Sequence, residues 1–175
     1  AYTCGDLLLQ PALLDAADEA LARLVRDTRK LPLTLIAGAP LRHGQTLYNC
    51  AVVFTQGRIL GVVPKTYIPD YTEFYENRWF ASGAGISEET IPVAGQAADF
   101  GAGLTFEVNG TEFGVELCED LVAHGTQRRE GDLQPLGIAR GRRQARLPAA
   151  ARSATVGTHD RGLCLLLGRL RRIID

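Results

Sequence analysis

The chain has 175 residues, of which 46% are hydrophobic, and its formal net charge is −1 at pH 7. These values suit one soluble domain with a substantial core, and no apolar run approaches the roughly 20 residues of a membrane helix. The four cysteines lie far apart, without a CxxC pair or companion histidines; they are Cys4, Cys50, Cys118 and Cys164. We therefore expect reduced thiols in a cytoplasmic protein, with no disulfide framework, no metal site and no membrane partner.

The first predicted element is a helix over residues 11–30. In PALLDAADEALARLVRDTRK the apolar residues recur on one face, and Pro11 suits the first helical turn. The preceding stretch, AYTCGDLLLQ, has no initiator Met and no signal-peptide layout, so we interpret it as the continuation of a longer chain.

Strands follow the helix. They are predicted over residues 32–38, 48–54, 58–63 and 104–117. The turn pairs Gln56-Gly57 and Asn109-Gly110 predict two hairpins in this region. A helix followed by buried strands and hairpins favours a layered α/β or α+β sandwich.

Two polar residues stand at predicted strand ends. In GVELCEDLV a strand runs into Cys118, which two acids follow, whereas Lys65 comes directly after the strand-breaking Pro64. An ammonium group near the cysteine would favour the thiolate, and a neighbouring carboxylate could take its proton. We therefore expect Lys65 and Cys118 at neighbouring strand ends, within a hydrogen-bond-scale distance of roughly 3–4 Å. A solvated lysine above an aromatic surface patch is the alternative.

The composition changes near residue 122. Residues 1–122 carry 8 basic and 16 acidic side chains, whereas residues 123–175 carry 11 Arg, no Lys, 4 acids and no aromatic residue. A basic tail is typical of nucleic-acid binding, but this one lacks aromatic rings for stacking and lysines for phosphate contacts. We expect no nucleic-acid partner and a poorly ordered tail, with any helix near residues 139–154. A basic-tailed binding protein stays an alternative.

Residues 1–120 resemble the glutaminase domain of bacterial glutamine-dependent NAD(+) synthetases, a branch of the nitrilase (carbon-nitrogen hydrolase) superfamily. The resemblance lies in GVVPKTYIPDYTEFYE and VELCED, and also in APLRHGQTLYNCAVVFTQGRILG and AYTCGDLLLQPALLDAA. It implies an incomplete nitrilase-like α-β-β-α sandwich, with residues 1–122 as a partial hydrolase domain. It also implies that L-glutamine is the substrate and that the released ammonia amidates deamido-NAD in NAD biosynthesis.

The same resemblance implies a Glu-Lys-Cys triad. Cys118 would attack the side-chain amide of glutamine to form a thioester, and Lys65 would polarise the oxyanion and orient the thiol. Glu73 occupies the place where many superfamily members have a second glutamate.

Further residues match the substrate pocket of the family. Tyr71 matches a glutamine-binding tyrosine, while Tyr2 and Glu119 would line the pocket. The general-base glutamate of the family lies a few residues before the position of Tyr2, in a segment like PELGLSGY, so these 175 residues do not include it. In the family an NLSAS-like strand end, whose serine helps to hold glutamine, and a later glutamine-binding arginine follow this point. Neither family motif is found after Asp120.

The resemblance also bears on cofactors and assembly. In the family ATP and Mg²⁺ bind a separate synthetase domain, and the whole enzymes form large homo-oligomers. We therefore expect no cofactor in residues 1–175 and little activity from this fragment alone. Another nitrilase-type amidase that acts on a small amide is the remaining alternative; a downstream synthetase domain would discriminate between the two.

A frameshift accounts for the tail. Degenerate codons for GLCLLLGRLRRIID, shifted by one base, permit Gly-Tyr-Val-Ser-Ser-Ser-Ala-Gly, similar to the YVYASAGFGEST segment of the family. LQPLGIARG likewise permits Cys-Asn-Leu-Ser-Ala-Ser. We therefore hypothesise that residues 123–175 are an Arg-rich, out-of-frame tail that begins shortly after Asp120.

Overall fold

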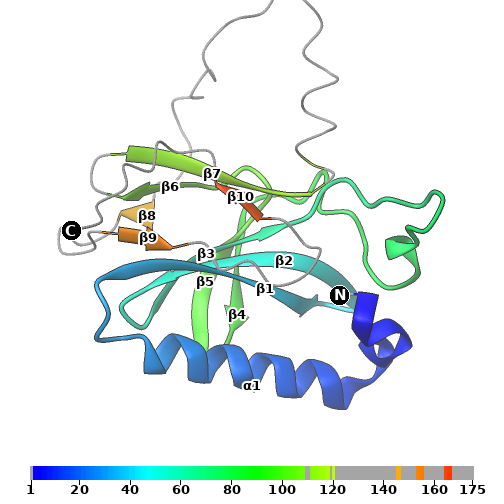
Figure 1. Ribbon diagram of the computed structural model, residues 1–175, viewed down its shortest axis with the longest axis horizontal. Helices are drawn as coiled ribbons and strands as arrows, with labels where there is room; N and C mark the ends of the chain where they lie inside the picture. Colours follow the sequence, from blue (N-terminus) through cyan, green and yellow to red (C-terminus); the bar gives the residue numbers. More distant parts are fainter. Residues whose placement is uncertain are drawn as a thin grey trace, which may run out of the picture.

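Three stacked layers make up the described part of the chain. The computed structural model describes residues 2–108, 111–118 and 120, and residues 145–146, 153–155 and 164–166 of the tail. Helix α1 (Pro11–Asp27) lies along one face of a six-stranded sheet, and a four-stranded sheet covers the other face (Figure 1). These are the α, β and β layers of the predicted nitrilase-like sandwich, and this fold class is confirmed.

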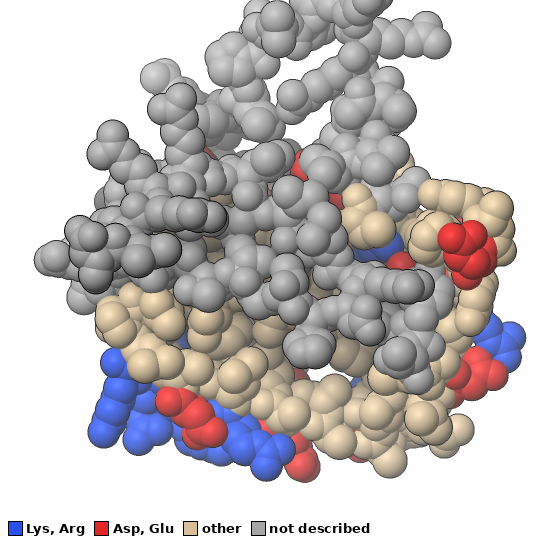
Figure 2. All heavy atoms as spheres, in the orientation of Figure 1, with Lys and Arg blue, Asp and Glu red and all other residues tan. Residues whose placement is uncertain are grey.

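Helix α1 begins where the sequence predicts and ends at Asp27, before the predicted end at residue 30. The Thr28 hydroxyl donates to the Val25 carbonyl oxygen at 3.2 Å, which supplies a partner to one of the last carbonyl groups of the helix. Basic side chains gather over this end of the helix layer in Figure 2, where they complement the helix dipole. Among the described residues, no helix combines the length and apolar character that a membrane crossing requires.

The larger sheet has the strand order β4-β5-β3-β2-β1-β9. Its strands are β1 (Leu33–His43), β2 (Thr46–Thr55), β3 (Arg58–Pro64), β4 (Glu89–Val93), β5 (Gln96–Phe100) and β9 (Ser153–Thr155). The first three confirm the strands predicted over 32–38, 48–54 and 58–63, with β1 longer than expected. The β4–β5 hairpin was not predicted.

Strand β2 shows how the larger sheet is buried on both faces. Cys50, Val52 and Phe54 pack in one apolar cluster with residues of α1. Ala51 and Val53, which point the opposite way, pack in a second cluster with the smaller sheet. A strand covered on both faces needs a continuous apolar run, which is what its sequence contains.

The smaller sheet has the strand order β10-β7-β6-β8. Its strands are β6 (Thr105–Val108), β7 (Thr111–Leu117), β8 (Ala145–Arg146) and β10 (Cys164–Leu166). β6 and β7 pair antiparallel, which confirms the hairpin predicted within 104–117, although its turn at 109–110 lies outside the described residues. The sheets approach so closely that a Cβ atom on Gly61 would lie 3.0 Å from the side chains of Leu104 and Phe106.

Most of the tail lies outside the described residues. Its described parts are β8, β9 and β10, which pair with β6, β1 and β7. Residues 145–146 are strand, within the stretch where the sequence favoured a helix if any formed. The poor order of the tail and its out-of-frame origin stay predictions.

Candidate active site

Lys65 follows directly on β3, and its side chain is buried. Only 1% of that side chain is exposed, and its Nζ lies 2.9 Å from Oε2 and 3.0 Å from Oε1 of Glu76. The Lys65 backbone is held as well, because its N–H donates to the Asn49 carbonyl and its own carbonyl accepts from Gly83 N–H, both at 2.8 Å. A buried ammonium group needs a charged partner, and here the Glu76 carboxylate is that partner. The alternative of a solvated surface lysine is therefore wrong.

Glu76, the partner of Lys65, is not among the site residues predicted from the sequence. It opens the short helix η2 (Glu76–Arg78), and its carbonyl accepts from the N–H groups of Trp79 and Phe80 at 3.0 and 2.9 Å. Those two aromatic residues are buried, which keeps this turn against the body of the domain. The signal was in the sequence: Glu76 precedes two large aromatic residues at helical spacing, so it shares their buried side.

Glu73 lies elsewhere. Its side chain is exposed, three residues before Glu76. A hydrogen bond from the Thr72 side chain, and a second from the backbone N–H of Glu73 itself, lower the pKa of this carboxyl group. The structure therefore brings Glu76, rather than Glu73, to the lysine, and the catalytic role of Glu73 stays a prediction.

Cys118 directly follows β7 in a turn. Its φ of 50° lies in the left-handed region, where a non-glycine residue costs of order 1–3 kcal/mol. Among the described cysteines Cys118 is exposed, Cys4 is half-buried and Cys50 is buried, and burial raises the pKa of the Cys50 thiol. Cys118 is thus the most exposed of these three thiols, and it lies on a strained turn of the kind often found at functional sites.

Asp120 joins the two strand ends. Its Oδ1 accepts from the backbone N–H groups of Thr66 and Tyr67 at 3.0 and 2.7 Å, and from the Thr66 hydroxyl at 2.8 Å. Its Oδ2 accepts from Leu117 N–H at 3.3 Å. The residues that follow Lys65 therefore lie against those that flank the thiol. The two ends belong to facing sheets rather than to one sheet, and the distance from lysine nitrogen to cysteine sulfur stays a prediction.

The predicted substrate residues are placed only in part. Tyr71 lies between Lys65 and Glu76 in the chain, is 51% exposed, and has its ring centroid 5.5 Å from that of Phe74. Tyr2 opens the short helix η1 (Tyr2–Leu9), but its side chain and the whole of Glu119 lie outside the described residues. The substrate roles of these three residues stay predictions.

The N-terminal segment is fixed next to Glu76. Asp6 of η1 accepts from Nε and Nη2 of Arg78 at 2.6 and 2.7 Å and from Nε1 of Trp79 at 3.0 Å. These hydrogen bonds, above all that from Arg78, lower the pKa of Asp6 to about 2. Leu8 is buried in the same cluster as Trp79. Helix η1 is therefore held against the turn whose Glu76 contacts Lys65.

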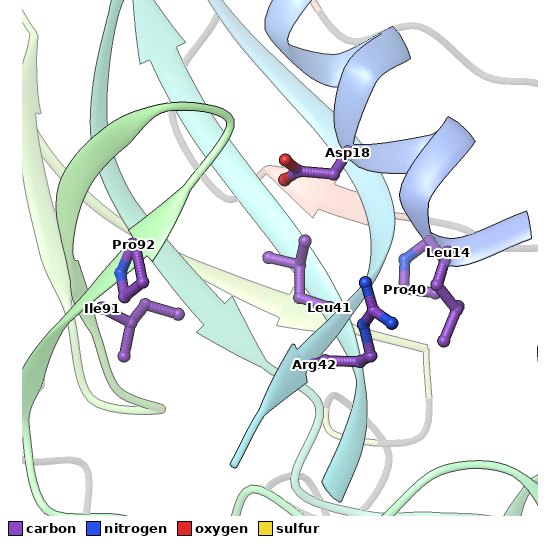
Figure 3. A pocket seen from close by; sticks show the side chains of 7 residues that line it. All are labelled: Leu14, Asp18, Pro40, Leu41, Arg42, Ile91 and Pro92. Carbon is purple, nitrogen blue, oxygen red and sulfur yellow. The ribbon is translucent and has the colours of Figure 1, made fainter. Parts of the chain in front are cut away.

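A separate hollow of about 140 Å³ lies between α1, β1 and β4 (Figure 3). Its lining residues are Leu14, Asp18, Pro40, Leu41, Arg42, Ile91 and Pro92. Asp18 is already engaged there, because its Oδ1 accepts from Ala94 N–H at 2.9 Å. The hollow includes none of the residues of the lysine–cysteine site.

The layers and the strand-end lysine define an incomplete nitrilase-like α/β sandwich. No protein-family model matches the chain. Glutamine-dependent NAD(+) synthetases of Mycobacterium tuberculosis and Mycobacterium leprae are 46% and 40% identical to it over 123 residues, which cover 69% of this chain. The solved glutamine-dependent NAD(+) synthetase of Acinetobacter baumannii superposes with a TM-score of 0.56 at 30% identity, covering 73% of this chain and 20% of that one.

Over this length the chain is a homologue of the glutamine-dependent NAD(+) synthetases. It spans 18% of the length of the mycobacterial relatives. The similarity thus concerns a part of those enzymes that is much shorter than the whole.

Proposed function

We propose that residues 1–122 are part of the glutaminase domain of a glutamine-dependent NAD(+) synthetase, in which Cys118 hydrolyses L-glutamine to glutamate and ammonia. The observation that carries the proposal is the buried Lys65–Glu76 pair, which Asp120 links to the strand end of the exposed thiol. A buried, fixed ammonium group at the end of one sheet, linked through Asp120 to a strand end of the other sheet that carries a thiol, supports amide hydrolysis through a thioester.

The proposed chemistry has two steps. The Cys118 sulfur bonds to the side-chain amide carbon of glutamine, the carbon–nitrogen bond breaks, and the thiol proton leaves with the nitrogen as ammonia. Water then adds to the thioester carbonyl, the carbon–sulfur bond breaks, and a proton from the water returns to sulfur as glutamate is released. Lys65 Nζ donates to the oxyanion of each tetrahedral intermediate, and Glu76 holds the ammonium group in place.

The rest of the proposal concerns the whole enzyme. The relatives carry synthetase in their name and are several times longer than this chain. We propose that the ammonia amidates deamido-NAD in a synthetase domain that binds ATP and Mg²⁺, in a cytoplasmic homo-oligomer. The 175 residues alone hydrolyse glutamine slowly or not at all, because the resemblance places the general base before Tyr2 and a base contributes typically 10²–10⁴-fold.

Ammonia release from glutamine tests the proposal. The test uses the 175-residue chain and a version that carries the upstream segment and the restored reading frame. We expect activity from the restored version, its loss in Cys118→Ala and Lys65→Ala, and its retention in the control Cys4→Ser. Full activity after Cys118→Ala would show that this thiol is not the nucleophile.

A further inference from the structure

We propose that Asp120 is a positioning residue, whose carboxylate fixes the Cys118 turn against the end of β3 and so sets the distance from Cys118 to Lys65. The inference rests on the proposed function, since it assigns Asp120 a part in presenting the thiol to the ammonium group. Asp120 touches neither the substrate nor the reacting atoms in this scheme; it acts through the backbone on either side of the site.

The hydrogen bonds within the two sheets do not set the distance from Cys118 to Lys65. In the described sheets β3 lies between β5 and β2, and β7 lies between β10 and β6, so β3 and β7 share no ladder. Val63 and Leu117, near the two strand ends, do pack in one apolar cluster. Apolar contacts are not directional, however, and do not set the distance between two strand ends to a fraction of an ångström.

Asp120 supplies directional contacts between the two strand ends. Its side chain is buried, and its Oδ1 accepts three hydrogen bonds from Thr66 and Tyr67 while its Oδ2 accepts one from Leu117 N–H. One rigid carboxylate thus contacts the residues directly after Lys65 and the residue directly before Cys118. Hydrogen bonds from backbone N–H groups to an ionised acceptor are among the stronger ones, which suits this function.

The turn at Cys118 needs such support. Its φ of 50° is unfavourable for a cysteine, so a free chain would relax toward an ordinary conformation. The bond from Leu117 N–H to Oδ2 spans the turn from one side to the other and holds it in this conformation. All four contacts are to Thr66, Tyr67 and Leu117, so in this scheme Asp120 holds the two strand ends and is not assigned the part of general base.

The rate of Cys118 alkylation by iodoacetamide in the 175-residue chain tests the proposal without requiring turnover. Peptide mapping by mass spectrometry assigns the rate to Cys118, and thermal unfolding checks that each variant is folded. Asp120→Ala removes all four contacts. Asp120→Asn keeps an acceptor for Thr66 and Tyr67 but presents an NH₂ group to Leu117 N–H. Asp18→Ala is the control, because it removes a contact between an aspartate and a backbone N–H away from the site.

We expect Asp120→Ala to slow alkylation about tenfold, because misplacement of a reacting group by about 1 Å can cost up to 10²-fold. Asp120→Asn should fall between the alanine variant and the parent, and Asp18→Ala should react like the parent. In a Lys65→Met/Glu76→Gln background, which removes both buried charges, Asp120→Ala should cause no further slowing. A purely structural effect would instead slow alkylation in both backgrounds.

Two results would overturn the inference. One is an alkylation rate of folded Asp120→Ala and Asp120→Asn within about twofold of the parent. The other is an equal slowing with and without Lys65. If Asp120→Ala does not fold, Asp120→Asn and Thr66→Val, which removes the hydroxyl contact alone, decide between the outcomes. Failure of the proposed function looks different: the restored version with the upstream segment would then not hydrolyse glutamine, although Asp120→Ala still slows Cys118 alkylation only when Lys65 is present.

Discussion

The pair of Lys65 and Glu76 predicts a large loss of stability when one partner is removed alone. Their side chains are 1% and 7% exposed, and both carboxylate oxygens lie within 3.0 Å of the ammonium nitrogen. Lys65→Met takes the ammonium group away from a buried carboxylate, and breaking a buried ion pair from one side typically costs about 3–5 kcal/mol. Because a domain is stable by only about 5–15 kcal/mol, this variant should unfold at much lower denaturant concentration.

Urea unfolding measures the effect. The chain has one tryptophan, Trp79, which is buried and donates its backbone N–H to the Glu76 carbonyl, so its fluorescence reports on this region. Glu76→Gln should cost less than Lys65→Met, because its amide oxygen still accepts from the ammonium group. The double variant Lys65→Met/Glu76→Gln should lose less than the sum of the two single losses, with a coupling of about 0.5–3 kcal/mol.

An exposed ion pair provides the control. Arg42 and Asp15 form a salt bridge with side chains 46% and 58% exposed, and Arg42→Met should cost about 0.2–1 kcal/mol at most. If Lys65→Met also costs less than about 1 kcal/mol, then Lys65 and Glu76 behave as a surface pair. The argument for a fixed, buried ammonium group at the site would then be wrong.

Three further predictions concern the frame of the site. Gly83→Ala would place a methyl group 2.8 Å from the proline ring that precedes Lys65, so it should cost about 1–3 kcal/mol of unfolding free energy, whereas the control Gly38→Ala, with open space around its Cα, should cost less. Because the pKa of Asp6 is lowered to about 2, its ionised side chain stabilises the fold above pH 3.8, and this stabilisation is lost as the pH falls through 2. The melting temperatures of parent and Asp6→Asn should therefore differ at pH 6 and converge near pH 2. An equal difference at both pH values would contradict the assignment. DNA sequencing should find the NLSAS-like and FGEST-like segments one base out of frame after Asp120, and their absence would contradict the frameshift.

The elements with a clear period or a clear turn were predictable from the sequence. Helix α1 has apolar residues on one face, and the hairpin of β2 and β3 turns at Gln56-Gly57, where both residues have positive φ angles of 46° and 81°. A glycine relieves one of these two positions, which is why the pair is a readable turn signal.

The hairpin of β4 and β5 was missed for a physical reason. Pro92 argues against a strand, but β4 lies at the edge of its sheet, where a missing N–H group is tolerated. Its turn also uses Ala94-Gly95 with positive φ angles of 49° and 75°, and alanine does not normally signal that conformation. The strand that contains Pro92 and the turn at Ala94-Gly95 therefore depend on tertiary position rather than on the local conformational preference of their residues.

The two site residues that directly follow strands were predictable from the sequence. Lys65 and Cys118 follow β3 and β7 directly, and such ends are common places for functional side chains. Glu76 was missed because the spacing from the lysine pointed to Glu73. Which of two glutamates turns inward depends on the short helix η2 and on the burial of Trp79, which spacing alone does not reveal.

The acids beside Cys118 pose an electrostatic question that the structure answers for Asp120. A carboxylate two residues from a thiol would be expected to oppose formation of the thiolate. In this structure the Asp120 carboxylate accepts hydrogen bonds from Thr66, Tyr67 and Leu117, and it thereby joins the two strand ends. The negative charge of Asp120, which disfavours the thiolate, is thus also the hydrogen-bond acceptor that links the strand end of Lys65 to the strand end of Cys118. An acid at this position is therefore expected from the architecture, in which the nucleophile and its cation come from different sheets.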